Sequence, residues 1–133
     1  MNLLACALAV LALAVPTAAA KEGVVAHLLT PLPEHAVAAQ KIRVAWTLRS
    51  VTDNGPRPFD AMGVFVRLLS PSGGRSTIAF AAGNTHPRGR FVARATVPRG
   101  GIGGIRIGLR GWNDYGTADV YFRIDNDPFT KVP

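Results

Sequence analysis

Residues 89–112, GRFVARATVPRGGIGGIRIGLRGW, decide the fold that this sequence predicts. Apolar and polar side chains alternate through residues 91–97 and again through residues 105–110, with arginine recurring on the polar side. A period of two with one apolar face and one charged face is typical of half-buried antiparallel strands. The stretch therefore predicts a pair of strands, with the glycine-rich segment 100–104 as a flexible hairpin connection or bulge.

Five further strands are predicted along the chain. Residues 41–50, KIRVAWTLRS, alternate most regularly and place Trp46 at the centre of the core. Residues 62–70 are apolar on nearly both faces, which indicates a central strand. The others are residues 24–29, 75–81 and 118–125. Seven strands, frequent turn signals and no convincing helix predict an all-β, immunoglobulin-like antiparallel β-sandwich, with a small barrel as the alternative.

The first twenty residues predict a signal peptide. Residues 3–15 form an unbroken apolar run, Pro16 ends it, and residues 18–20 are small, as a signal peptidase requires. We expect cleavage after Ala20, which leaves residues 21–133 as one secreted or extracytoplasmic domain in the periplasm or cell wall. A retained anchor is the alternative, because no Lys or Arg precedes the run. We expect no transmembrane span in the mature chain, since no other segment approaches about 18 apolar residues.

The charge of the chain favours anionic partners in a general way. Its 133 residues include 15 basic and 8 acidic side chains, for a net charge of +7. Such a charge attracts anionic surfaces in a salt-dependent manner. Nucleic-acid binding is not expected, because an exported protein rarely meets nucleic acid. The arginines expected to project from strands are Arg43, Arg49, Arg67, Arg90, Arg94, Arg106, Arg110 and Arg123.

No motif in the sequence predicts catalysis. The chain has no G-x-S-x-G elbow and no H-E-x-x-H pair. The glycines of residues 100–104 precede a strand where a phosphate-binding loop requires a helix. The only cysteine, Cys6, lies in the predicted signal, so the mature domain has neither a thiol nor a disulfide. We therefore expect that the protein is not an enzyme.

Two sets of residues could in principle form a metal site. Copper could be held only by His27, His35, His86 and Met62, and these would have to converge through the loops at the ends of a sandwich. Solvated loop histidines are the simpler interpretation, so no cofactor is expected and copper is the alternative. Residues 125–128, DNDP, offer oxygen ligands for a hard cation, but an Asx turn that ends the strand explains them more simply.

Three patterns resemble those of small exported immunoglobulin-like domains of actinobacteria and other bacteria. They are V-x-A-x-L-x-x-P-x-P at residues 24–33, V-x-W-x-L at residues 44–48 and G-R-F-x-A-x-x-x-V-P at residues 89–98. The last resembles the YtkA-like family, and the first resembles the opening of the CopC-like copper-resistance sandwiches. The resemblance implies an extracytoplasmic binding module. In CopC-like proteins a histidine at the mature N-terminus binds copper, and that role could fall only to His27.

The sequence thus predicts a non-catalytic binding or interaction module of the bacterial cell envelope. Its expected partner is an envelope protein or an anionic cell-surface component. The alternative is a periplasmic-type copper-binding protein.

Overall fold

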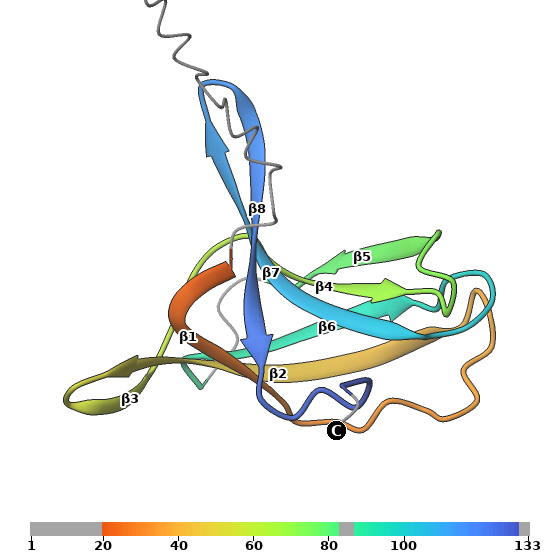
Figure 1. Ribbon diagram of the computed structural model, residues 1–133, viewed down its shortest axis with the longest axis horizontal. Coiled ribbons are helices and arrows are strands. Elements are labelled where there is room, and N and C mark those ends of the chain that lie inside the picture. The colour runs from red at the N-terminus through yellow and green to blue at the C-terminus, as the bar shows by residue number, and fades with distance from the viewer. Residues whose placement is uncertain (1–19, 83–86, 131–133) are drawn as a thin grey trace, which may run out of the picture.

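The computed structural model describes residues 20–82 and 87–130, which fold into eight strands without a helix (Figure 1). This confirms the predicted all-β class. The strands are β1 (Ala20–Leu28), β2 (Lys41–Thr52), β3 (Gly55–Pro58), β4 (Val64–Leu69), β5 (Ser76–Phe80), β6 (Arg90–Thr96), β7 (Gly104–Asn113) and β8 (Gly116–Ile124).

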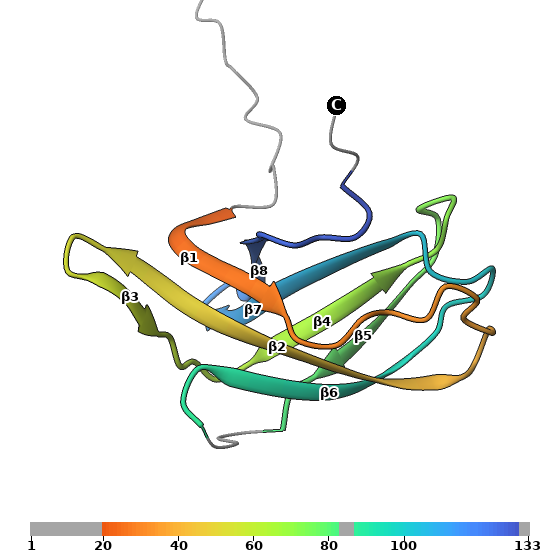
Figure 2. The ribbon, with the colours of Figure 1, turned by 90° about the horizontal axis from the view of Figure 1, so that it is seen from below.

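All eight strands belong to one strongly curled sheet. Its order is β3-β2-β1-β8-β7-β4-β5, and β6 pairs with the first half of β2 on the edge that β3 also uses. Every pair is antiparallel except β1 with β8. The curl brings the β6–β2 wall opposite the β4–β5 wall, as in a sandwich (Figure 2). The two layers of the predicted sandwich are therefore halves of one sheet, joined by the parallel pair β1–β8.

The curled sheet stops just short of closing on itself. Its free edges, β5 and β6, lie close to each other without forming a backbone ladder among the described residues. One side chain bridges them, because the Thr77 hydroxyl donates to the carbonyl oxygen of Thr96. The concave side of the sheet thereby encloses a single core.

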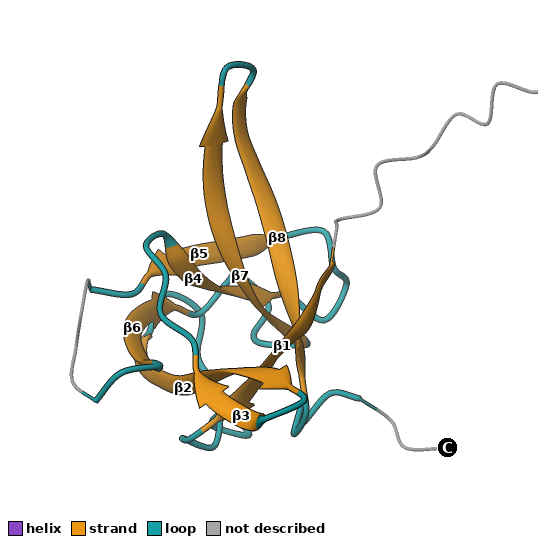
Figure 3. Cartoon of the chain, turned by 90° about the vertical axis from the view of Figure 1, so that its left-hand side faces the viewer, coloured by secondary structure: helices purple, strands orange, loops and turns teal. Residues whose placement is uncertain are grey.

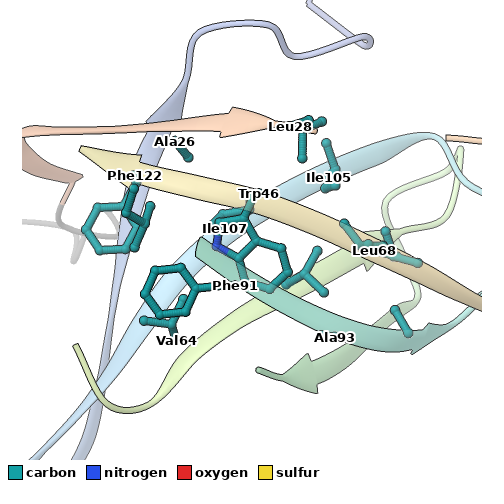
Figure 4. Close-up of a cluster of buried hydrophobic side chains, with 14 of the residues drawn as sticks. Ala26, Leu28, Trp46, Val64, Leu68, Phe91, Ala93, Ile105, Ile107 and Phe122 are labelled. Carbon is teal, nitrogen blue, oxygen red and sulfur yellow. The ribbon is translucent and has the colours of Figure 1, made fainter. Parts of the chain in front are cut away.

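Trp46 lies at the centre of that core, as the sequence predicts. Its side chain is fully buried and stacks on Phe91, with ring centroids 6.0 Å apart and planes 18° apart (Figure 4). The indole N–H of Trp46 has no hydrogen-bond partner among the described residues. Around the two rings pack apolar side chains from both walls, including Val44, Leu48, Val64, Val66, Leu68, Ala95, Ile107 and Phe122. Burial of these side chains is the main source of stability in a domain of this kind.

Both strands predicted in residues 89–112 form, but the prediction that they pair with each other is wrong. β6 pairs with β2 in one wall, whereas β7 lies between β4 and β8 in the other. The glycine-rich connection crosses between the walls instead of turning tightly. The N–H of Gly103 donates to the carbonyl of Leu69 at 2.7 Å, and a Cβ at Gly103 would lie 2.3 Å from the Cα of Pro71. Glycine is required there for close approach to the end of β4.

β3 is not among the seven strands that the sequence predicts. β2 runs on to Thr52, and the chain reverses at Asp53 and Asn54 before β3 pairs with the end of β2. Gly55 supports the reversal with a φ of 95°, a left-handed angle that favours glycine. Prolines are tolerated in β3 because an edge strand has one side without a ladder partner.

Candidate functional site

The sequence-predicted copper ligands lie on separate parts of the fold. His27 is exposed on the outer side of β1, and its Nδ1 lies 2.7 Å from Oδ1 of Asp125. His35 is exposed in the connection between β1 and β2, and Met62 is exposed just before β4. His86 lies outside the described residues. Within residues 20–82 and 87–130, no three His, Cys, Asp or Glu side chains form a group that could hold a metal ion.

The DNDP segment that follows β8 has its side chains in local hydrogen bonds. The carboxylate of Asp125 accepts a hydrogen bond from Nδ1 of His27. The side-chain amide of Asn126 accepts the N–H of Leu28 at 2.8 Å and donates to its carbonyl at 2.9 Å. Asp127 Oδ1 accepts the N–H of Phe129 at 2.9 Å, which is the Asx turn that the sequence predicts. These oxygens therefore tie the end of β8 to β1 and to the tail.

The convex face of the sheet is rich in arginine. Core side chains alternate with outward ones on every long strand, as in the buried Ile105 and Ile107 on either side of the exposed Arg106. The arginines of β2, β4, β6, β7 and β8 consequently lie on the convex face, as the alternation of the sequence predicts. Strands β4, β7 and β8 contain one acidic residue, Asp119.

One transverse row of this face is charge-compensated. Arg110 on β7 lies opposite Asp119 on β8 and donates two hydrogen bonds to its carboxylate, at 2.8 and 3.1 Å. Arg67 adds a third nitrogen 3.7 Å from the same carboxylate. The hydrogen bonds from Arg110 lower the pKa of Asp119 and raise that of Arg110, against the opposing effect of desolvation. We call Arg110 and Asp119 the paired row.

The paired row covers an aromatic cluster on the outside of the sheet. The guanidinium of Arg110 lies 5.6 Å from the ring centroid of Phe65 and 5.2 Å from that of Phe80. Phe65 is fully buried there, and its ring makes edge contacts with Phe80 and Tyr121. Cation–π contacts and a bidentate ion pair hold Arg110 in place, so this arginine is a structural residue.

A second transverse row carries arginine on β4, β7, β8 and β2, with Val25 at the β1 position. Arg67 lies opposite Arg106, and Val25 on β1 lies opposite both Arg123 and Arg49. The β7–β8 ladder ends at Ile107 with Phe122, and Arg106 and Arg123 are the next residues beyond that pair on the two strands. We call Arg106, Arg123 and Arg49 the arginine row, and Arg67 stands at its end beside Asp119.

Two shallow depressions lie along the arginine row. One, of about 570 Å³, extends over β1 between Arg49 and Arg123, with Val25 among the residues that line it. The other, of about 450 Å³, has Arg106, Arg123 and Tyr121 in its lining. Arg123 therefore borders both.

The β7–β8 hairpin projects from the body of the sheet as an arm (Figures 1 and 3). β7 pairs with β4 only as far as Leu109, and β8 meets β1 only from Tyr121 onward. Residues 111–118 lie between these limits, and all of them are exposed. Among the described residues, neither edge of this segment pairs with another strand. We call residues 111–118 the arm.

Two aromatic side chains stand at the tip of the arm. Trp112 is 83% exposed and Tyr115 is fully exposed. The turn between them is fixed locally, because the N–H of Tyr115 donates to Oδ1 of Asn113 at 2.8 Å and Gly116 has a φ of 117°. Sequence reasoning assigns residues 113–117, between two predicted strands, no functional role. The signal that it missed is two large aromatics beside a turn in a chain whose other tryptophan is buried.

Comparison of the chain with protein-family models, curated proteins and solved structures finds no match. The resemblance to YtkA-like and CopC-like domains therefore stays a prediction. Over the described residues, no helix has the length and apolar character needed to cross a membrane.

Proposed function

We propose that this protein is a non-catalytic, extracytoplasmic binding module of the bacterial cell envelope, which contacts a protein partner through the arm. The observation that carries the proposal is the exposure of Trp112 and Tyr115 on a projecting hairpin. Tryptophan and tyrosine are the side chains that most often dominate protein–protein binding energy. Monomeric surfaces seldom leave a tryptophan so exposed.

The base of the arm supports a binding role because it is held firmly. Arg110 and Asp119 clamp β7 to β8 directly below the arm, and the N–H of Arg110 donates to the carbonyl of Gly63 at 2.9 Å. An isolated two-stranded hairpin is only marginally stable in water. A clamped base presents the aromatics at a smaller entropic cost on binding.

The charge of the arm favours a protein over an anionic surface as its partner. Residues 111–118, GWNDYGTA, carry one charge, that of Asp114. The arm has no Lys or Arg that would attract an anionic polymer. Its strand edges, which are unpaired among the described residues, can instead add to a β-sheet of a partner protein. Main-chain hydrogen bonds would then supply affinity, and pockets for Trp112 and Tyr115 would supply specificity.

The test measures binding of the purified exported chain to isolated envelope proteins. The double variant Trp112→Ser/Tyr115→Ser is expected to lower affinity at least about tenfold, as loss of hot-spot aromatics does. Val37→Ser, which removes an exposed apolar side chain far from the arm in sequence, is the control and should bind as wild type. Unchanged binding of the double variant would contradict the proposal.

Emission of Trp112 gives an independent readout. The chain has two tryptophans, and Trp46 is fully buried, so a collisional quencher reports on Trp112. The partner should protect Trp112 from the quencher. If protection instead depends on the concentration of the chain alone, a second copy occupies the arm and the assignment to an envelope partner is wrong.

The export and copper hypotheses have their own tests. N-terminal sequencing of the exported protein should give Lys21 as the first residue, and a chain that keeps residues 1–20 would contradict cleavage. No contact among the described residues favours copper. Copper uptake that His27→Ala abolishes would establish the alternative function.

A further inference from the structure

The arginine row is electrostatically unfavourable as a purely structural feature. Arg106 lies opposite Arg67 on β4, and together with Arg123, which follows the last β7–β8 pair on β8, it lines one depression. Like charges directly opposite one another destabilise a sheet. Elsewhere on the same face, Arg110 lies opposite Asp119, a pairing of opposite charges that stabilises the sheet. The uncompensated row therefore calls for a ligand that supplies negative charge.

The acids nearest the row do not neutralise it. Asp125 lines the depression with Arg49 and Arg123, but its carboxylate is hydrogen-bonded to Nδ1 of His27 at 2.7 Å. Asp127 lines the other depression, and its carboxylate accepts the N–H of Phe129. Among the described residues, no salt bridge reaches Arg49, Arg106 or Arg123.

The spacing of the row fits several anionic groups in line. Neighbouring strands are about 4.8 Å apart, so the backbone positions of Arg106 and Arg49 are separated by about 14 Å, three strand intervals. Arg49 and Arg123 flank the small side chain of Val25, which leaves room for an oxyanion between two guanidinium groups. Guanidinium groups bind oxyanions such as phosphate and carboxylate through paired hydrogen bonds.

We propose that the arginine row is a binding site for a linear polyanion that lies across the strands, with successive oxyanion groups at Arg49–Arg123 and at Arg123–Arg106. This site is separate from the arm and does not depend on the function proposed for it. Both depressions are shallow surface features bordered by Arg123, which suits a chain crossing the face rather than a single enclosed ion. The Phe and Tyr side chains in their lining are Phe122, which is buried, and Tyr121, whose ring is covered by Arg106 at 5.3 Å, so the row offers no platform on which nucleic-acid bases could stack.

The test is titration of the full chain with inorganic polyphosphate of about 15 phosphates at low salt. Arg49→Gln/Arg123→Gln should weaken binding at least about tenfold and lower the slope of log K against log salt by about two, the number of contacts removed. The control Arg57→Gln/Arg99→Gln removes the same charge from exposed positions outside the row. An equal loss in both double variants would overturn the site, because net charge alone would then explain binding.

Three further probes separate the sources of the anion. Orthophosphate should bind far more weakly than polyphosphate, and equal affinity per site would overturn a linear ligand. Polygalacturonate carries carboxylates on a sugar chain, so the stronger of the two polymers identifies the group that the row prefers. Vesicles with 30% anionic lipid should show no dependence on Arg49 and Arg123, and a dependence as large as that for polyphosphate would assign the row to a membrane instead.

Discussion

The two transverse rows on the convex face use the same residue for different purposes. In the paired row, Arg110 has a carboxylate opposite it and aromatic rings beneath it. In the arginine row, Arg123 has no carboxylate opposite it and lines one depression with Arg106 and another with Arg49. The difference teaches that an arginine on a strand is not interpretable from its side chain alone. Its cross-strand neighbours decide whether it stabilises the sheet or is available to bind a ligand.

The largest expected effect is a difference in the free energy of unfolding between an arginine variant of the paired row and one of the arginine row. Arg110→Ala should lower the free energy of unfolding by about 2 kcal/mol, because it uncovers Phe65 and leaves the partly buried Asp119 without its main partner. Arg123→Ala should change it by less than about 0.5 kcal/mol. Urea denaturation of both variants measures the difference, and equal costs would refute the distinction.

A smaller loss is expected from the acidic partner of the paired row. Asp119→Asn keeps the shape of the side chain but loses its charge, and it should cost about 1 kcal/mol at neutral pH. Asp53→Asn, which changes an acid in the β2–β3 turn, is the control. The account requires a clearly larger loss at residue 119.

The pH dependence of stability should identify the same carboxylate. The pKa of Asp119 is lowered in the folded protein, so its contribution is fully present above the unfolded Asp pKa of about 4. That contribution is lost as pH falls through the folded pKa, because protonation removes the charge that Arg110 binds. Unfolding of wild type between pH 5 and about 2 should show this loss, and Asp119→Asn should show less of it. Identical pH profiles would contradict the assignment.

The smallest expected effect is the response of the arginine row to salt. Screening should relieve repulsion among Arg49, Arg123 and Arg106, raising stability by a few tenths of a kcal/mol between 10 and 200 mM salt. The double variant Arg49→Gln/Arg123→Gln should lose part of that rise. Chloride is the anion to use, since phosphate or sulfate could occupy the site.

The core and the strands could be predicted from the sequence because alternation is a local signal. It located Trp46, the central strand at residues 64–69 and the outward direction of the arginines. The pairing of β6 and β7 could not be predicted, since adjacency in sequence favours a hairpin while contacts such as Gly103 with Pro71 decide otherwise. Pro56 and Pro58 concealed β3, an edge strand that tolerates them.

The candidate surfaces were less predictable than the fold. Which arginine lies opposite Asp119 depends on the register of β7 and β8. The arginine row depends on the pairing of the last two strands, β7 and β8, with the first two, β1 and β2. The arm arises because β7 continues past Leu109, which lies opposite Val64, the first residue of β4. No local pattern encodes either feature.

The central claim is that the arginine row costs the fold stability and repays it by binding a polyanion. Denaturation of Arg123→Glu at low salt, with and without inorganic polyphosphate, tests it most directly. The account predicts that the variant is about 0.5 kcal/mol more stable than wild type, because Glu would line one depression with Arg106 and the other with Arg49. It also predicts that polyphosphate raises the midpoint of wild type but not of the variant. A variant that is less stable, and that polyphosphate stabilises as much as wild type, would contradict the account.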